Sequence, residues 1–190
     1  MTPSRATATS PVPTPTPVNP ADVFQRPLPT WSPHCLGFGS EWRYCDGKAL
    51  RSCPKGAVWL HTGVDIETGI QPVVAAGDGE IAGYIVDPTF RGGALIRHHT
   101  TSGVYLTQYW HVWLRSEFKV GSPVKRGQAF ADIADMGSRT HFHFAVFQGD
   151  FEQHSWNGAL PPSECSGFPA FPYHFIDPNA FLDAHRGGGT

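Results

Sequence analysis

The sequence predicts a mostly β fold, in which an antiparallel sheet forms a sandwich or a barrel-like structure with long loops and a short C-terminal helix. Composition is the first reason. The 190 residues include 21 glycines and 18 prolines but only 16% charged residues, which favours turns and strands over amphipathic helices. The second reason is that short apolar or alternating runs follow one another from residue 57 onward, separated by turn residues. A chain of this length can bury the core of one domain.

The N-terminal part of the chain differs in composition from the rest. Residues 1–30 are rich in Thr, Pro, Ser and Ala and have little apolar surface to bury, so we expect a disordered tether. Residues 31–56 hold three of the four cysteines without a regular period, and we expect a Cys-rich lead-in segment there. The main domain is then expected over residues 57–185, followed by a Gly-rich tail at residues 186–190.

The segments expected as strands are short runs bounded by turn residues. Residues 100–103 are expected to close a hairpin as a four-residue loop. Residues 148–172 form a long excursion without a regular pattern, and such loops are usually functional or disordered. Asp177 at an N-cap position and Pro178 at the first helical position predict the short terminal helix. In chain order, the expected strands are residues 57–60, 61–66, 72–76, 80–86, 94–99, 104–113, 129–133 and 141–147.

The cysteines indicate the compartment. Their number is even, and none of their spacings is the Cys-x2-4-Cys of a structural zinc site. We therefore expect disulfides and an oxidising, extracytoplasmic location, although the spacing does not determine the pairing. Four unpaired buried thiols are the alternative. The residues concerned are Cys35, Cys45, Cys53 and Cys165.

Charge and hydropathy exclude some classes of partner. The formal net charge is -2, without the clustered Lys and Arg that a nucleic-acid surface needs. No apolar run approaches the ~18 residues of a membrane span. The first residues also lack a charged region followed by an apolar one, so we expect any export signal to lie outside this chain.

The segment His141-Phe142-His143 is the central candidate for a functional site. Residues two apart on a strand share a face, so both imidazoles would point to one site, about 6.6 Å apart. Phe142 and every second residue after it would face a core. Histidines on a strand are also common as ordinary polar residues, so this motif alone does not establish a metal site.

A second pair of candidate ligands lies earlier in the chain, at His61 and Asp65. Gly63 and Val64 between them favour a loop or a bulged strand over a helix. With one imidazole of the 141/143 pair they would offer two nitrogens and one carboxylate, the set that leaves a fourth zinc position open. The same set describes the non-haem Fe(II) oxygenases, and spacing alone does not separate the two.

Three further histidines lie on expected strands. Regular alternation on the strand 104–113 places His111 on the same face as Tyr109, and opposite to the face of Trp110. His98 and His99 lie at a strand end; they could support a metal ligand or contact a substrate, but we expect them to be structural.

Several ordered pieces of the sequence resemble those of one family. They are His61-x-x-x-Asp65, Gly69-x-x-Pro72-Val73-x-Ala75 with Asp78-Gly79, Ile96-x-His98, Tyr109-Trp110-His111, Gly121-x-x-Val124-x-x-Gly127-Gln128, His141-Phe142-His143-Phe144 and Ile176-Asp177-Pro178. In this order they resemble the lysostaphin/LytM-type zinc metallopeptidases, peptidoglycan endopeptidases with the duplicated hybrid motif fold, over about residues 56–183. The usual His-Leu-His of the family reads His-Phe-His here. This departure concerns the shape of the accepted substrate more than the activity.

The resemblance implies a role for each candidate residue. By position, His61, Asp65 and His143 would bind one Zn2+ ion, and His111 and His141 would be catalytic. Because the chain has no His-Glu-x-x-His helix, an imidazole has to act as the general base. We expect His141 to take the proton of the zinc-bound water and His111 to stabilise the oxyanion, with roles that could be shared or exchanged.

The resemblance also implies a function. We expect a secreted or envelope-associated, monomeric metalloendopeptidase whose domain at residues 57–185 cleaves peptide cross-links or stem peptides of bacterial peptidoglycan by attack of a zinc-bound water. The alternatives are a non-catalytic peptidoglycan-binding or regulatory module, the Fe(II) oxygenase, and a peptidase for a non-wall substrate such as a Gly-rich protein segment.

Overall fold

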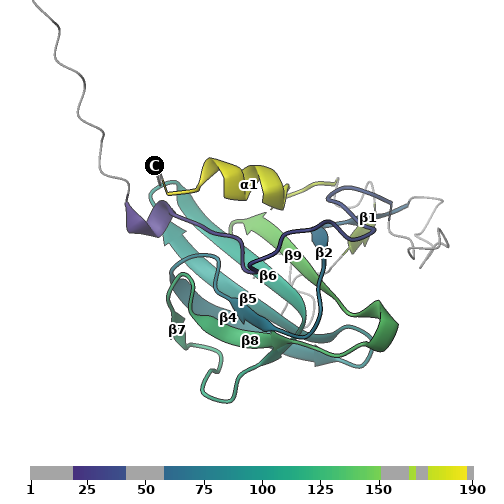
Figure 1. The fold of residues 1–190 in the computed structure, drawn as a ribbon. Coiled ribbons are helices and arrows are strands. Elements are labelled where there is room, and N and C mark those ends of the chain that lie inside the picture. The colour runs from purple at the N-terminus through teal and green to yellow at the C-terminus, as the bar shows by residue number, and fades with distance from the viewer. Residues whose placement is uncertain (1–18, 42–57, 151–162, 166–170, 188–190) are drawn as a thin grey trace, which may run out of the picture.

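A nine-stranded antiparallel sheet carries the fold, and one short helix packs against it (Figure 1). The computed structural model describes residues 19–41, 58–150, 163–165 and 171–187. Within them the predicted fold class is confirmed: the chain is mostly antiparallel β with a short helix near its C-terminus. The elements are η1 (Pro20–Asp22), β1 (Trp59–His61), β2 (Val64–Glu67), β3 (Pro72–Val74), β4 (Gly79–Asp87), β5 (Arg91–Thr100), β6 (Gly103–Leu114), β7 (Pro123–Val124), β8 (Ala129–Ile133), η3 (Gly137–Arg139), β9 (His141–Gln148), β10 (Ser163–Cys165), β11 (Phe175–Ile176) and α1 (Pro178–Ala184).

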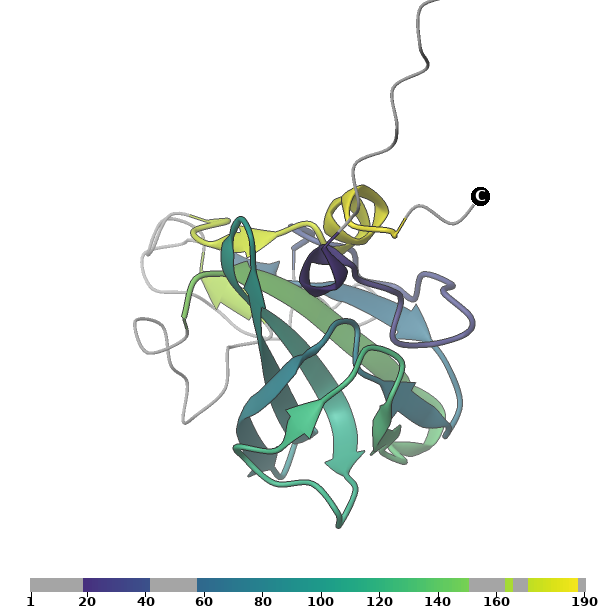
Figure 2. The same ribbon diagram turned by 90° about the vertical axis from the view of Figure 1, so that its left-hand side faces the viewer.

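The long strands β4, β5, β6 and β9 form the centre of the sheet, in the order β11-β9-β6-β5-β4-β7. Strand β2 pairs with β9, and β8 pairs with both β3 and β6. Strand β6 therefore has two partners on one edge: its first part pairs with β9, and its last part, from Val112 to Leu114, pairs with β8. Figure 2 shows the resulting twist of these strands around one another.

The sheet has a buried cluster on each face. In β9, Phe142, Phe144 and Val146 belong to the larger cluster, whereas Ala145 and Phe147 belong to the smaller one on the other face. This alternation was predicted from the sequence. Residues from α1 and from the N-terminal segment complete the larger cluster, because Phe24, Leu28, Phe181 and Leu182 are buried in it.

The N-terminal segment is more ordered than composition predicted. Residues 19–30 were expected to belong to a disordered tether, but they contain η1 and bury Phe24, whose ring lies 4.8 Å from that of Phe181 in α1. Residues 1–18 lie outside the described part of the chain. At the other end, Arg186 forms a bridge with Phe24, so the expected tail is also partly packed against the domain. Buried apolar side chains and backbone hydrogen bonds, such as those from Phe24 N–H to His185 O and from Gln25 N–H to Ala76 O, fix this segment.

Two further expectations need correction and one is confirmed. The hairpin between β5 and β6 closes with Thr100 paired to Gly103, so its loop has two residues and not four. The excursion at residues 148–172 contains the strand β10, which pairs with β1. The helix α1 begins as predicted, with the Asp177 carboxylate accepting a hydrogen bond from the Asn179 N–H and a proline at its first position. None of the helices in the described ranges is long and apolar enough to span a membrane.

The cysteine predictions fall largely outside the described residues. Cys35 is not a free cysteine. Cys45 and Cys53 lie in residues 42–57, which the structure does not describe, and of Cys165 only the backbone is described. Disulfide pairing therefore stays a prediction.

His98 is structural, as expected from the sequence, and it links the sheet to the β3–β4 turn. The side chain is fully buried. Its Nδ1 lies 2.8 Å from the carbonyl oxygen of Asp78 and its Nε2 lies 2.7 Å from Thr107 Oγ1. A carbonyl oxygen only accepts, so Nδ1 carries the proton and Nε2 accepts from the threonine hydroxyl. Burial lowers the pKa of His98 to about 4, which keeps the ring neutral near pH 7.

The buried His98 should make the folded state sensitive to acid. In the unfolded chain a histidine titrates near pH ~6.5, so between that value and the folded pKa of about 4 the unfolded state binds one proton more. Stability is therefore lost as the pH falls through this window, by at most about 3 kcal/mol from this residue. Urea unfolding of the His98→Gln variant, followed from pH 7 to pH 4, should show a weaker pH dependence. The exposed neighbour gives the control, His99→Gln, which should retain the wild-type slope; an unchanged slope in His98→Gln would contradict the assignment.

Candidate metal centre

The corner between β1 and β2 brings His61 and Asp65 to the strand that carries the His-x-His motif. His61 ends β1, Asp65 lies in β2, and Asp65 is paired directly with His143 of β9. Gly63 at the corner makes this approach feasible, since a Cβ added there would lie 2.3 Å from the carbonyl oxygen of Phe144. Of the expected alternatives, a loop or a bulged strand, the chain forms a bend at Thr62-Gly63 between β1 and β2, and the convergence of the two ligands depends on this glycine.

A side chain at Gly63 should therefore disrupt the site. In Gly63→Ala the new methyl group would meet backbone of β9, which cannot rotate away, so β1 has to move relative to β9. We expect the variant to lose at least about 10-fold in metal affinity and about 2 kcal/mol or more in stability. Chelator competition and urea unfolding measure the two effects. Gly69→Ala is the matched control, because a Cβ there meets nothing within 4 Å; equal behaviour of the two variants would contradict this role for Gly63.

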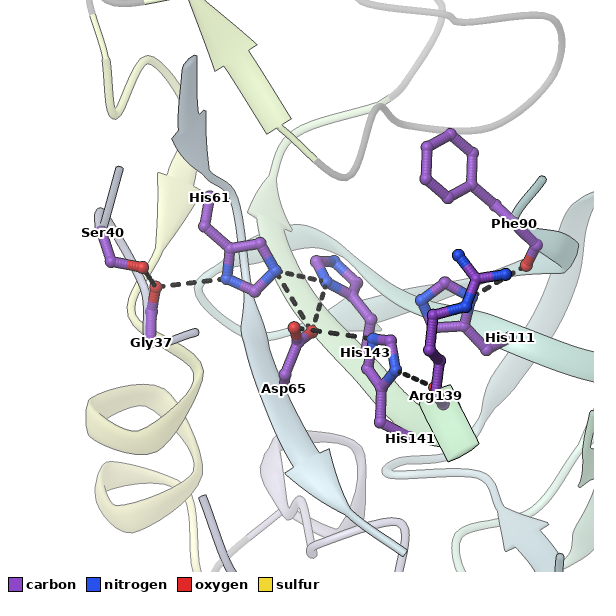
Figure 3. Close-up of polar contacts among 9 residues, drawn as sticks. All are labelled: Gly37, Ser40, His61, Asp65, Phe90, His111, Arg139, His141 and His143. Carbon is purple, nitrogen blue, oxygen red and sulfur yellow. Dashed lines mark hydrogen bonds and ion pairs between the residues drawn. The ribbon is translucent and has the colours of Figure 1, made fainter. Parts of the chain in front are cut away.

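Three buried ligand atoms converge between β1, β2 and β9 (Figure 3). His61 Nε2 lies 2.8 Å from His143 Nδ1, and each of these nitrogens lies 3.2 Å from Asp65 Oδ1. Two ligands of a tetrahedral Zn2+ with bonds of about 2.0 Å are separated by about 3.3 Å, so the site needs to open only slightly to hold such an ion.

Backbone carbonyls set the protonation of three of the site histidines (Figure 3). The Nδ1 atom of each lies within hydrogen-bond distance of a carbonyl oxygen: 3.1 Å from Gly37 for His61, 2.9 Å from Phe90 for His111, and 2.7 Å from Arg139 for His141. Because these oxygens can only accept, the proton of each neutral ring is on Nδ1, and Nε2 carries a lone pair. His61 is thereby prepared as a metal ligand, and His111 and His141 as proton acceptors.

The negative charge of the buried Asp65 carboxylate favours the binding of a cation at this site. Burial alone would raise the pKa of the Asp65 carboxyl, but His61 and His143 outweigh this effect and hold the pKa well below its usual range. Burial also lowers the pKa of His143 to about 4, so this ring is neutral near pH 7. Among the described residues, Asp65 forms no ion pair with a Lys or Arg. A buried carboxylate without a Lys or Arg partner is an environment in which a bound metal ion would balance the charge.

His111 reaches the site through a bulge in β6. Trp110 packs in the smaller cluster and Val112, two residues on, packs in the larger one, so alternation is interrupted at the residue between them. His111 has a φ of 65°, and the pairing with β5 shifts between Gly92 and Gly93 at this point. The expectation that His111 shares a face with Tyr109 is therefore wrong. The bulge adds one residue and turns the imidazole to the face that carries His141.

His111 and His141 lie beside the three ligand atoms. Their ring centroids are 4.3 Å apart, and His141 Nε2 lies 3.6 Å from Asp65 Oδ2. Burial, followed by the neighbouring His141, lowers the pKa of His111 to about 3. The structure thus brings together all five residues that the sequence singled out as candidate ligands or catalytic groups, while His98 lies apart from them in the core.

Sequence reasoning missed the residues that support this arrangement. Gly37, Phe90 and Arg139 act through their main-chain oxygens, and nothing in their side chains indicates this. His34 was assigned no role, yet its ring stacks on that of His141 at 5.2 Å. It lies in a segment that was expected to be a lead-in, and no local pattern around it indicates a role in the site.

The comparisons with known proteins agree with this geometry. The model of peptidase family M23 matches residues 60–155, which include all five site residues. The chain belongs to peptidase family M23. This confirms the predicted relation to the lysostaphin/LytM-type metallopeptidases. No curated protein sequence matches this M23 peptidase.

Two lysostaphin structures share the fold of this M23 peptidase. Lysostaphin from Staphylococcus simulans is 24% identical, with a TM-score of 0.52, over 84% of this chain and 53% of lysostaphin. The catalytic domain of lysostaphin alone is 22% identical, with a TM-score of 0.53, over 80% of this chain and 92% of that domain. A zinc-containing peptidase from Vibrio cholerae is 26% identical, with a TM-score of 0.49, over 65% of this chain and 36% of that one. The chain thus spans between about a third and a half of the two longer proteins.

Proposed function

We propose that this M23 peptidase is a zinc-dependent endopeptidase that cleaves peptide cross-links or stem peptides of bacterial peptidoglycan. The observation that carries the proposal is the convergence of His61 Nε2, Asp65 Oδ1 and His143 Nδ1. Beside these atoms lie the imidazoles of His111 and His141, whose Nε2 atoms carry a lone pair. Two nitrogens and one carboxylate oxygen are the ligand set of a catalytic zinc. The site that would hold one Zn2+ ion is therefore His61, Asp65 and His143.

The chain's own residues would divide the work as follows. A bound Zn2+ supplies an acidified water as nucleophile and polarises the scissile carbonyl. His141 takes the proton of the attacking water at Nε2, since its Nδ1 proton is held by Arg139 O. His111 would stabilise the oxyanion from Nε2 once that atom has received the water's proton from the neighbouring His141, because the other ring proton of His111 is held by Phe90 O. Burial opposes a positive charge on His111, which favours His141 as the first acceptor.

Family membership supports a peptidase over the other two classes. A non-haem Fe(II) oxygenase uses the same three ligands but does not require two further imidazoles that can accept protons. A binding or regulatory module needs neither the three ligands nor the two further imidazoles, whereas all five residues are present here. We further propose an extracytoplasmic enzyme, since its substrate would lie outside the cell membrane, and we retain the expectation of a monomer.

The substrate class can be tested with defined fragments. Purified, zinc-loaded protein is incubated with cross-linked peptidoglycan fragments that contain Gly-Gly, D-Ala-Gly or D-Ala-diamino acid bonds, and with a Gly-rich protein peptide. Mass spectrometry of the products should show cleavage of one wall fragment. Binding without new amine ends would indicate a binding module, iron with O2 consumption an oxygenase, and cleavage of the protein peptide alone a non-wall substrate.

A further inference from the structure

His34 lies at the edge of the site although it belongs to the N-terminal segment. Residues 32–36 run along the outer edge of β2, where the Glu67 N–H donates to Ser32 O at 2.9 Å and the His34 N–H donates to Asp65 O at 2.8 Å. The bridge between Pro33 and Ile66 is antiparallel. Opposed residues of antiparallel strands share a face, so the side chain of His34 lies on the same face as that of the metal-ligand candidate Asp65.

The ring of His34 stacks on the ring of His141. Their centroids are 5.2 Å apart and their planes differ by 15°, which is within the range of offset-stacked aromatic pairs. The backbone bond from His34 to Asp65 O fixes the main chain of His34 relative to β2, and this places its ring beside that of His141. His34 therefore connects the strand of one ligand candidate to the imidazole proposed as the base.

His141 has few other constraints on its ring. Its Nδ1–H bonds to Arg139 O, in a residue that is itself exposed on the short turn η3. The distance from Nε2 to Asp65 Oδ2, 3.6 Å, is too long for a hydrogen bond, and the ring of His111 is tilted by 57°. One hydrogen bond fixes a single point of the ring and leaves rotation about it, whereas a contact over the ring face restricts that rotation.

We propose that His34 is a positioning residue that holds the imidazole of His141 in its reactive orientation. The inference rests on the proposed function, in which His141 Nε2 accepts a proton. It makes residues 32–36 part of the active site and not a removable lead-in. Because the ladder with β2 uses the backbone of His34, the side chain can be changed without breaking the ladder.

The experiment compares His34→Ala with His34→Phe, which retains a flat ring. In the metal-free protein, NMR of the His141 ring protons, assigned with a His141→Ala spectrum, reports the stack directly, and His34→Ala should shift them downfield while His34→Phe should not. In the zinc-loaded protein, His34→Ala should lower kcat between about 3- and 30-fold with KM and zinc affinity unchanged, and His34→Phe should restore most of kcat. His99→Ala, at an exposed position of β5, is the control and should behave as wild type.

Each other outcome overturns the inference. Unchanged His141 signals or an unchanged kcat in His34→Ala would show that the stack positions nothing. Equal losses in Ala and Phe would show that the imidazole itself is needed, and a raised KM with constant kcat would show that His34 contacts the substrate. A wild-type protein that cleaves no fragment overturns the proposed function instead, while the NMR comparison still decides whether His34 holds His141.

Discussion

Replacing Asp65 with Asn should abolish zinc binding and lower peptidase activity by about 10³-fold or more. The variant has the same shape but removes the negative charge among three imidazoles, and that charge is what attracts a dication to this buried site. A metal that polarises the substrate contributes several kcal/mol to the rate, and each 1.36 kcal/mol is a factor of about ten. Calorimetric titration with Zn2+ and the rate of fragment cleavage measure the two losses.

Thermal unfolding gives an independent measurement of the same variant. A ligand that binds only the folded state stabilises it, by about 4 kcal/mol when its concentration is 1,000 times its Kd. Zinc should therefore raise the Tm of the wild-type protein and leave that of Asp65→Asn unchanged. Asp132→Asn is the matched control, since its carboxylate pairs with Arg115 at the surface, away from the site. A zinc-dependent Tm in Asp65→Asn would exclude Asp65 as a ligand.

Replacing His141 with Ala should lower kcat by about 10² to 10⁴-fold while zinc stays bound. The variant removes the proposed proton acceptor but none of the three ligand atoms, and general acid–base groups contribute rate factors of this size. His111→Ala should show a loss in the same range, because its ring lies beside that of His141. Initial rates on the cleaved fragment, with the zinc content of each variant measured, test both.

The double variant tests whether the two imidazoles act as a unit. Groups that serve the same step are strongly non-additive, so His111→Ala/His141→Ala should be at most about 10-fold slower than the slower single variant. His174→Ala, at an exposed position outside the site, should retain full activity. Substantial turnover by either single variant, or losses that simply multiply, would contradict the assignment.

Local patterns predicted the parts of the fold that depend on near neighbours. The period of two in β9 placed Phe142 and Phe144 in the core, and the Asp177-Pro178 pair predicted the start of α1. The ligand candidates were recognisable for the same reason, because a strand with His at alternate positions and a glycine between His61 and Asp65 are both features of short segments.

The remaining errors concern interactions between distant segments. Alternation assigned His111 to the wrong face, since the bulge depends on how β6 meets Gly92 and Gly93 of β5 and then changes partner from β9 to β8. A pair of glycines opposite a strand is the signal that could have indicated it. Composition likewise hid the packing of Phe24, because one buried ring among many prolines scarcely changes an average.

The carbonyl contacts of His61, His111 and His141 have a consequence for how this site can vary among relatives. Each contact uses an atom that every amino acid carries, so substitutions at Gly37, Phe90 and Arg139 preserve it as long as the chain keeps its path. A Cβ at Gly37, for instance, would meet nothing within 4 Å. Insertion or loss of one residue next to any of these positions would move the oxygen and release the proton that it holds. Loop length, more than residue identity, is therefore the quantity to compare when activity is inferred for other sequences of this kind.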